Sequence, residues 1–159
     1  MTSTKPQAIA NAFLERARNE GRALTPLQIQ KLVFLAHGWS LSLCGKGLID
    51  EPIQAWTYGP VIRSLYDDFK SFGSDPILQM ATVYENGEFS TPVEKSPEAA
   101  SLFNFVWDRY KDLTAGQLSR LTHLPGSPWS QVDKNDFIPN WLVKQYYDEQ
   151  KKLGNKCQV

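Results

Sequence analysis

Hydrophobic residues recur at helical spacing along most of the chain, and in residues 26–44 they extend almost all round the helix. A helix that is apolar on nearly every side must be covered on several sides, so this segment predicts a central, buried helix. Thr25 is its expected N-cap, Pro26 suits the first helical position, and Gln28 completes a capping box. The residues expected on its main buried face are Ile29, Leu32, Val33, Ala36, Trp39 and Leu43.

Five further segments combine an amphipathic stripe with helix start or stop signals. They predict helices at residues 6–20, at about 61–72 after a turn at Gly59-Pro60, at about 97–110, at 115–123, and after Pro139. The residues expected on the buried stripes are Ile9, Phe13, Leu14 and Ala17 in the first helix, Leu65, Phe69 and Phe72 in the next, Leu102, Phe103, Val106, Trp107 and Tyr110 in the fourth predicted helix, and Leu142, Val143, Tyr146 and Leu153 in the last.

Two short segments have β character. Residues 53–58, IQAWTY, are β-branched and aromatic, which favours an extended segment or strand. Asn86-Gly87 separates two β-prone runs and predicts a hairpin with strands at about 79–85 and 88–91. The predicted fold is therefore mainly α (α+β): a compact single domain over residues 1–159, with about six helices around the central helix, a small β-hairpin near 79–91, and a frayed tail at 154–159.

Charge and composition narrow the range of partners. The 17 basic and 17 acidic residues cancel, whereas proteins that bind nucleic acid through many phosphates usually carry a basic surplus. We therefore do not expect a nucleic-acid partner. The sequence shows neither a run of about 20 apolar residues nor the features of a signal peptide, so we expect a cytoplasmic protein without a membrane partner. In a reducing cytoplasm Cys44 and Cys157 are expected to be free thiols.

The chemically reactive residues do not form a recognisable catalytic or metal-binding set. The two histidines, His37 and His123, and the cysteines lack the spacing of a zinc site. The Gly45-Lys46-Gly47 segment follows a predicted helix and lacks the other residues of a phosphate-binding loop. If the protein were an enzyme, His123 near Trp56 and Tyr58 would be the candidate site. We expect no enzymatic activity, no cofactor and no metal.

Three aromatic residues near turns allow two interpretations. Trp56 and Tyr58 lie in the extended segment, and Trp129 follows a turn rich in proline. Core packing is the simpler interpretation, because large aromatic side chains are mostly buried in folded proteins. The alternative is a recognition surface, where Trp, Tyr and Arg dominate binding energy. Arg63 could join such a surface, or could pair with Asp67 four residues later.

Three motifs in order along the chain resemble the Panacea domain family, whose members are also described as phage-associated proteins or SocA-like antitoxins. The first motif runs from Thr25 to Trp39, and the second, QAWTYGPV, covers residues 54–61. The third combines Leu118–His123, LSRLTH, with Pro128-Trp129. The resemblance marks a set of residues as structural parts of these motifs: Thr25, Pro26, Gln30, Lys31, Leu32, Gly59 and Pro60.

The resemblance implies an antitoxin of a toxin–antitoxin module, often found on prophages, which neutralises a cognate toxin by direct protein–protein binding. The toxin is expected to be the product of the adjacent gene. The alternative that the resemblance leaves open is a proteolytic adaptor that delivers its toxin partner to a Clp-type protease. Residues 54–63 form a longer segment than a connection between two helices requires. We therefore expect this segment to lock the C-terminal turn onto the core, and its outer side, with Arg63 and the turn at Trp129, to lie near the toxin. The candidate partner-binding residues are Trp56, Tyr58, Arg63, His123 and Trp129.

Overall fold

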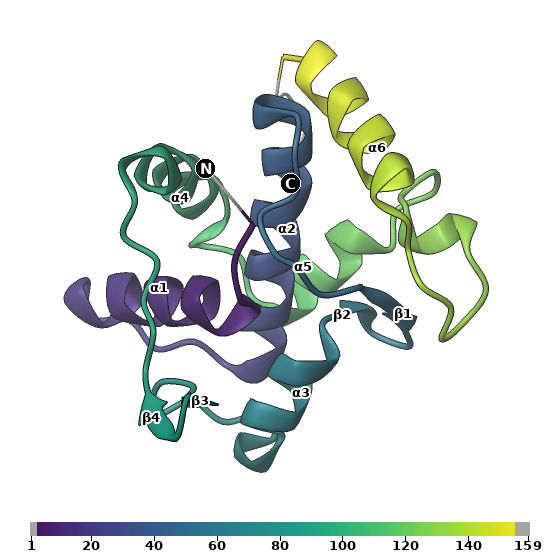
Figure 1. The fold of residues 1–159 in the computed structure, drawn as a ribbon. Helices are drawn as coiled ribbons and strands as arrows, with labels where there is room; N and C mark the ends of the chain where they lie inside the picture. The colour runs from purple at the N-terminus through teal and green to yellow at the C-terminus, as the bar shows by residue number, and fades with distance from the viewer. Residues whose placement is uncertain (1–2, 155–159) are drawn as a thin grey trace.

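The central helix α2 (Pro26–Cys44) runs through the middle of the fold in a computed structural model that describes residues 3–154 (Figure 1). Every residue from Ile29 to Ser42 is buried. The Gln28 backbone N–H donates to the Thr25 hydroxyl at 3.3 Å, and the Thr25 N–H donates to the Gln28 side chain at 2.9 Å. The predicted central helix and its capping box are therefore confirmed.

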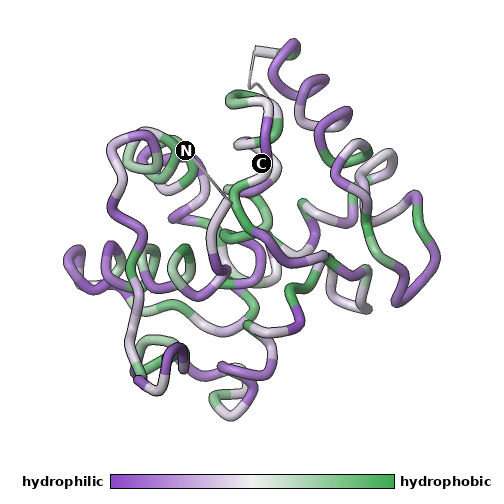
Figure 2. The backbone as a smooth tube through the Cα atoms, viewed as in Figure 1, coloured by the Kyte–Doolittle hydropathy of each residue, from purple (hydrophilic) through white to green (hydrophobic). Residues whose placement is uncertain are grey.

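Within residues 3–154, five other helices cover α2 on several sides (Figure 1). Their bounds are α1 Pro6–Asn19, α3 Arg63–Phe69, α4 Pro97–Tyr110, α5 Ala115–Thr122 and α6 Asn140–Lys152, with short 3-10 helices η1 Lys70–Phe72 and η2 Trp129–Gln131. Helices α1, α4 and α6 make the most extensive contacts with α2. Figure 2 shows the outer helix α6 as mostly hydrophilic, in agreement with its position at the edge of the fold. The mainly α prediction is thus confirmed.

Two residues expected in the core are exposed. Leu43, in the last turn of α2, is 45% exposed, because the chain turns away at Gly45 with a positive φ of 77°. Leu153 is 59% exposed and lies beyond the end of α6. In α6 the buried aromatic residue is Tyr147, at 4% exposure, whereas the predicted Tyr146 is only half-buried. The predicted stripe of α6 was therefore wrong at its C-terminal end.

The segment after Trp56 differs from the prediction. Strand β1 (Gln54–Trp56) pairs with an antiparallel strand β2 (Gly59–Val61), so residues 59–61 form a strand and the next helix begins only at Arg63. Gly59 makes this turn possible, because its φ of +115° strongly favours glycine. Backbone hydrogen bonds between residues 135–138 and residues Ile53 and Ala55 cover the other edge of β1.

The second hairpin is present but shorter than predicted. Strands β3 (Val83–Glu85) and β4 (Glu88–Ser90) pair across Asn86 and Gly87, which have φ values of 53° and 79°. Positive φ at both turn positions is typical of the type I′ turn that this dipeptide favours.

The remaining predictions about the chain as a whole have mixed outcomes. Cys44 is an exposed free thiol, whereas Cys157 and residues 155–159 of the predicted tail lie outside the described residues. Within residues 3–154, no helix has the length and apolar character needed to cross a membrane. The assignment of residues 1–159 to a single domain stays a prediction.

Candidate partner-binding site

Three consecutive backbone carbonyls at the β1–β2 turn are each bound by a side chain of the C-terminal motif. The Trp129 indole N–H donates to the Trp56 carbonyl at 2.6 Å, and the Ser119 hydroxyl donates to the Tyr58 carbonyl at 2.9 Å. Between them, His123 Nε2 lies 2.9 Å from the Thr57 carbonyl oxygen. These bonds fix the turn at residues 56–58 against α5 and η2, and we call them the carbonyl lock.

Two polar residues of α2 hold the other side of the same hairpin. The Gln30 side chain donates to the Ile62 carbonyl at 3.0 Å and accepts from the Ile62 N–H at 2.8 Å. The Lys31 ammonium donates to the Pro60 carbonyl at 3.0 Å and is fully buried. Burial lowers the pKa of Lys31 to about 7, because an ammonium ion loses its hydration inside the protein. The conformation of residues 60–62 is therefore set by α2 itself.

Gly59 lies where these two sets of contacts meet. A Cβ atom at this position would come within 2.7 Å of the Thr122 hydroxyl and 2.9 Å of the Lys31 Nζ. Both the positive φ and the lack of space exclude other residues without a shift of the backbone. The glycine thus lets α2, α5 and the hairpin approach one another closely.

Outside the lock, two aromatic rings contact each other, and each ring has a cationic side chain beside it. The Arg63 guanidinium lies 5.8 Å from the centre of the Trp56 ring, and the Lys70 ammonium lies 5.9 Å from the Tyr66 ring. The Trp56 and Tyr66 rings themselves meet edge to face at 4.9 Å. We call these four residues the cation–aromatic ladder. Asp67 forms ion pairs with both ends of it, at 3.4 Å from Arg63 and 3.6 Å from Lys70.

A groove of about 620 Å³ runs beside the ladder. Pro26 and Leu27 of α2, Val61 of β2 and Leu65 of α3 give it an apolar lining. Trp56, Tyr58 and Tyr66 also line it, and Tyr58 is 68% exposed. An exposed apolar groove next to aromatic and cationic side chains has the composition of a protein-recognition site.

Comparison with known proteins assigns the chain to a family. The family described as Antitoxin SocA-like, Panacea domain, matches residues 29–130, which is more than half of the chain. The chain belongs to this family. It is also similar to Antitoxin SocA of Caulobacter vibrioides (strain NA1000 / CB15N), at 26% identity over 133 residues, covering 82% of this chain and 71% of that protein. No solved structure matches the chain.

The matched region of this SocA-like domain contains all five candidate binding residues, and the structure brings them to one surface. Tyr58 and Arg63 are exposed, whereas Trp56, His123 and Trp129 are half-buried. The rings of His123 and Trp129 lie 4.0 Å apart. Core packing alone therefore does not describe these aromatic residues, since Tyr58 is exposed and the others are half-buried, and a role in recognition stays a prediction.

Tyr66 and Lys70 were not predicted to belong to this surface, although a signal was present in the sequence. Together with Arg63 they are spaced at i, i+3 and i+7, which places all three on one face of a helical segment. The role of Ser119 in the lock has no spacing signal in the sequence, because its partner is the distant Tyr58 carbonyl.

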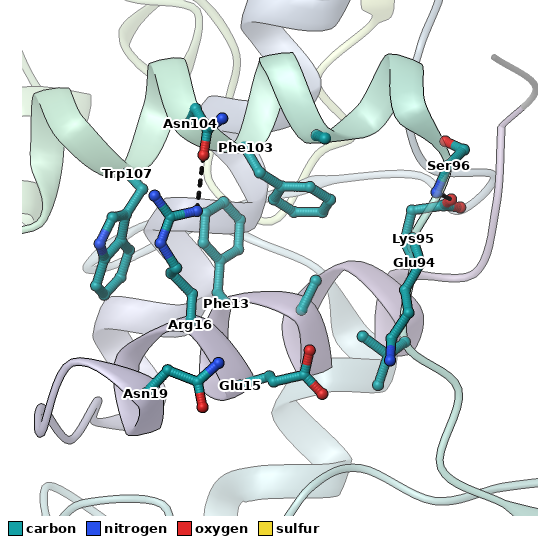
Figure 3. A pocket seen from close by; sticks show the side chains of 13 residues that line it. Phe13, Glu15, Arg16, Asn19, Glu94, Lys95, Ser96, Phe103, Asn104 and Trp107 are labelled. Carbon is teal, nitrogen blue, oxygen red and sulfur yellow. Dashed lines mark hydrogen bonds between the residues drawn. The ribbon is translucent and has the colours of Figure 1, made fainter.

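A second pocket, of about 180 Å³, contains none of these residues. It lies between α1, α4 and residues 93–96 (Figure 3). The Arg16 guanidinium in it donates to Asn104 at 2.8 Å and to Glu20 at 3.0 Å. The Glu20 carboxylate in turn accepts from the Trp107 indole at 2.9 Å. This set of bonds joins the two helices, so the pocket is explained as a helix–helix contact.

The two histidines already have structural partners. The Leu48 N–H donates to His37 Nδ1 at 3.1 Å, and His37 Nε2 lies 2.9 Å from the Asn140 side-chain oxygen, which joins α2 to α6. Burial lowers the pKa of His37, and the bond to Asn140 partly opposes this shift. His123 faces the carbonyl oxygens of Thr57 and Ser119. Among residues 3–154, no three His, Cys, Asp or Glu side chains gather as a metal site would require.

Proposed function

We propose that this protein is an antitoxin that neutralises its cognate toxin by direct binding at the surface formed by the ladder, Tyr58 and the groove. The observation that carries this proposal is the convergence of all three family motifs at one exposed surface. The first motif provides Gln30 and Lys31, the second provides the β1–β2 hairpin, and the third provides the lock. The name of the similar protein, Antitoxin SocA, supports the same function.

The physical character of this surface suits protein binding. Tyr58 is 68% exposed and Tyr66 is 41% exposed, and a partner could bury both rings. Tyrosine, tryptophan and arginine are the residues that most often dominate the energy of protein interfaces. The carbonyl lock holds the backbone of residues 56–58 in place before a partner arrives, so little ordering entropy would be lost on binding.

The toxin is proposed to be the product of the adjacent gene, and co-expression tests this. We expect that product to stop growth when it is expressed alone, and growth to resume when this protein is produced with it. Purification of a tagged copy should recover the toxin as a stable complex. A harmless product, or one that remains toxic in the presence of this protein, would contradict the proposal for that pair.

A half-life measurement separates sequestration from delivery to a protease. If the protein only holds the toxin, the half-life of the toxin should stay unchanged or increase when both are present. A shorter half-life that depends on a Clp-type protease would replace sequestration with the adaptor function.

An exposed tyrosine pair provides a matched test of the site. Tyr58→Ala should weaken the complex by roughly 2 kcal/mol, or about thirtyfold in Kd, because a central aromatic contact is lost. Tyr84→Ala is the control, since Tyr84 is 62% exposed but lies on the β3–β4 hairpin. If Tyr58→Ala weakens binding no more than Tyr84→Ala does, the interface does not centre on Tyr58.

A further inference from the structure

We propose that the groove receives a segment of the toxin that carries apolar side chains and a carboxylate, and that Lys70 and Arg63 bind this carboxylate. This inference rests on the proposed function and specifies the chemistry of the partner. Three observations support it: the positive charge beside the groove, the weak ion pairs of Arg63 and Lys70 with Asp67, and the hydrogen bonds that already occupy the backbone of β1 and β2.

The lining of the groove has an asymmetric charge. Lys70 is the one charged side chain among the described residues that line it, and no acidic side chain is among them. Arg63, which stacks on the Trp56 ring at the same edge, adds a second positive charge. The apolar floor formed by Leu27, Val61 and Leu65 favours apolar side chains of a partner.

The two cations share a single carboxylate within this protein. Asp67 lies 3.4 Å from Arg63 and 3.6 Å from Lys70, and the three side chains are 47–62% exposed. Exposed ion pairs of this kind contribute little, about 0–1 kcal/mol, because water and salt screen them. The edge therefore keeps a net positive charge, and a partner carboxylate can bind there without breaking a strong existing interaction.

The backbone of the hairpin offers little for the addition of a further strand. Strand β1 is paired with β2 on one edge and with residues 135–138 on the other. On the far side of β2, the Pro60 and Ile62 backbone groups are bound by Lys31 and Gln30. A partner segment would accordingly be recognised by its side chains in the groove, and the carboxylate sets its position.

A library of short random peptides displayed on phage provides a probe that needs no knowledge of the toxin. Peptides selected on the wild-type protein, after depletion on an Ala115→Phe variant, should carry apolar residues and at least one Asp or Glu. Ala115 lines the groove, and a phenyl ring there would narrow it while the Thr114 cap is retained. Far-UV circular dichroism and the unfolding temperature show whether that variant keeps its fold.

Charge reversal then tests the carboxylate contact without changing a buried residue. Lys70→Glu should weaken a selected acidic peptide by roughly tenfold, and exchange of the peptide acid for lysine should restore binding to this variant. Lys46→Glu is the control, because Lys46 is exposed and follows the C-terminal end of α2, whereas Pro26 and Leu27 at the N-terminal end of α2 line the groove. Its affinity should stay unchanged.

Several outcomes would overturn the inference. One is a selection that enriches no peptide over the Ala115→Phe protein, and another is a set of peptides without acids. Binding that is equal on the wild-type and Lys70→Glu proteins would also reject it.

The same variants distinguish this inference from the proposed function. If a folded Ala115→Phe protein still neutralises the toxin as well as wild type, the groove proposal fails and the antitoxin function stands. If the wild-type protein neutralises no adjacent-gene product, the proposed function fails, whatever the peptides show.

Discussion

Helix α2 and the β1–β2 hairpin are both well ordered by their surroundings, but different forces hold them. In α2 the residues from Ile29 to Ser42 are buried, and most of them are apolar. In the hairpin, three carbonyls are bound by Trp129, His123 and Ser119, and two more by Gln30 and Lys31. Apolar burial is non-directional, whereas hydrogen bonds require defined distances and angles.

This difference connects structure to function. The core can exchange one apolar side chain for another of similar volume and keep its fold. The hairpin depends on atoms at particular places, and those atoms set the direction of Trp56, Tyr58 and the ladder. We therefore expect core substitutions to change stability, and hairpin substitutions to change partner binding by more than their effect on stability explains.

The largest effect is expected for truncation in the core. Leu32 is 1% exposed on α2, so Leu32→Ala should lower the free energy of unfolding by about 2–5 kcal/mol through lost burial and a cavity. Leu32→Met conserves volume and should lower it by less than about 1.5 kcal/mol. Urea unfolding measures both, and toxin affinity of the folded fraction should be unchanged in each. A similar decrease in the free energy of unfolding for both variants would mean that the core depends on the exact shape of its side chains, as the hairpin depends on exact atom positions.

The next effect is expected at the hairpin glycine. Gly59→Ala should lower the free energy of unfolding by about 2–4 kcal/mol, because the φ of +115° is strained and the Cβ would meet Thr122 and Lys31. Gly45→Ala is the matched control, since Gly45 has a φ of +77° but no atom within 4 Å of a Cβ. The control should lose only about 1 kcal/mol. Toxin binding should fall for Gly59→Ala alone.

A pH-dependent effect of intermediate size is expected from Lys31. Its pKa is about 7 in the folded protein, whereas the ordinary value of a lysine, 10.5, applies to the unfolded chain, so the unfolded chain binds the proton more tightly. Stability should therefore rise with pH between about 7 and 10, by about 2 kcal/mol from pH 7 to pH 9. Lys31→Met removes the titrating group and should flatten this rise. Unfolding curves at pH 7, 8 and 9 measure the slope, and an unchanged slope in the variant would show that Lys31 is not its source.

The central helix was predictable because its signals are local. Thr25, Pro26 and Gln28 define its start within four residues, and the absence of a polar face indicates burial. The exposure of Leu43 was not predictable, because it depends on where the covering elements end.

The hairpin lock was not predictable from spacing, since its contacts join residues 61–73 positions apart. Gly59-Pro60 was predicted as a turn into the next helix, whereas these residues begin strand β2, where Gly59 has a positive φ and Lys31 binds the Pro60 carbonyl. The motifs of the family resemblance contain the residues that form the lock, but they gave no geometry. The i, i+3, i+7 spacing from Arg63 would have added Tyr66 and Lys70 to the candidate residues.

The smallest effect on stability should come from one bond of the lock, and it gives the sharpest contrast with the core. Trp129→Phe keeps an aromatic ring beside His123 but removes the indole N–H that donates to the Trp56 carbonyl at 2.6 Å. Loss of one hydrogen bond should lower the free energy of unfolding by about 1 kcal/mol. Trp141→Phe is the control, because Trp141 is 67% exposed, and should change it by less than about 0.5 kcal/mol. Because the lock positions Trp56 and the ladder, the loss in toxin affinity for Trp129→Phe should exceed the loss in stability. Isothermal titration with the toxin, beside urea unfolding, measures both, and an affinity equal to wild type would mean that the lock serves the fold alone.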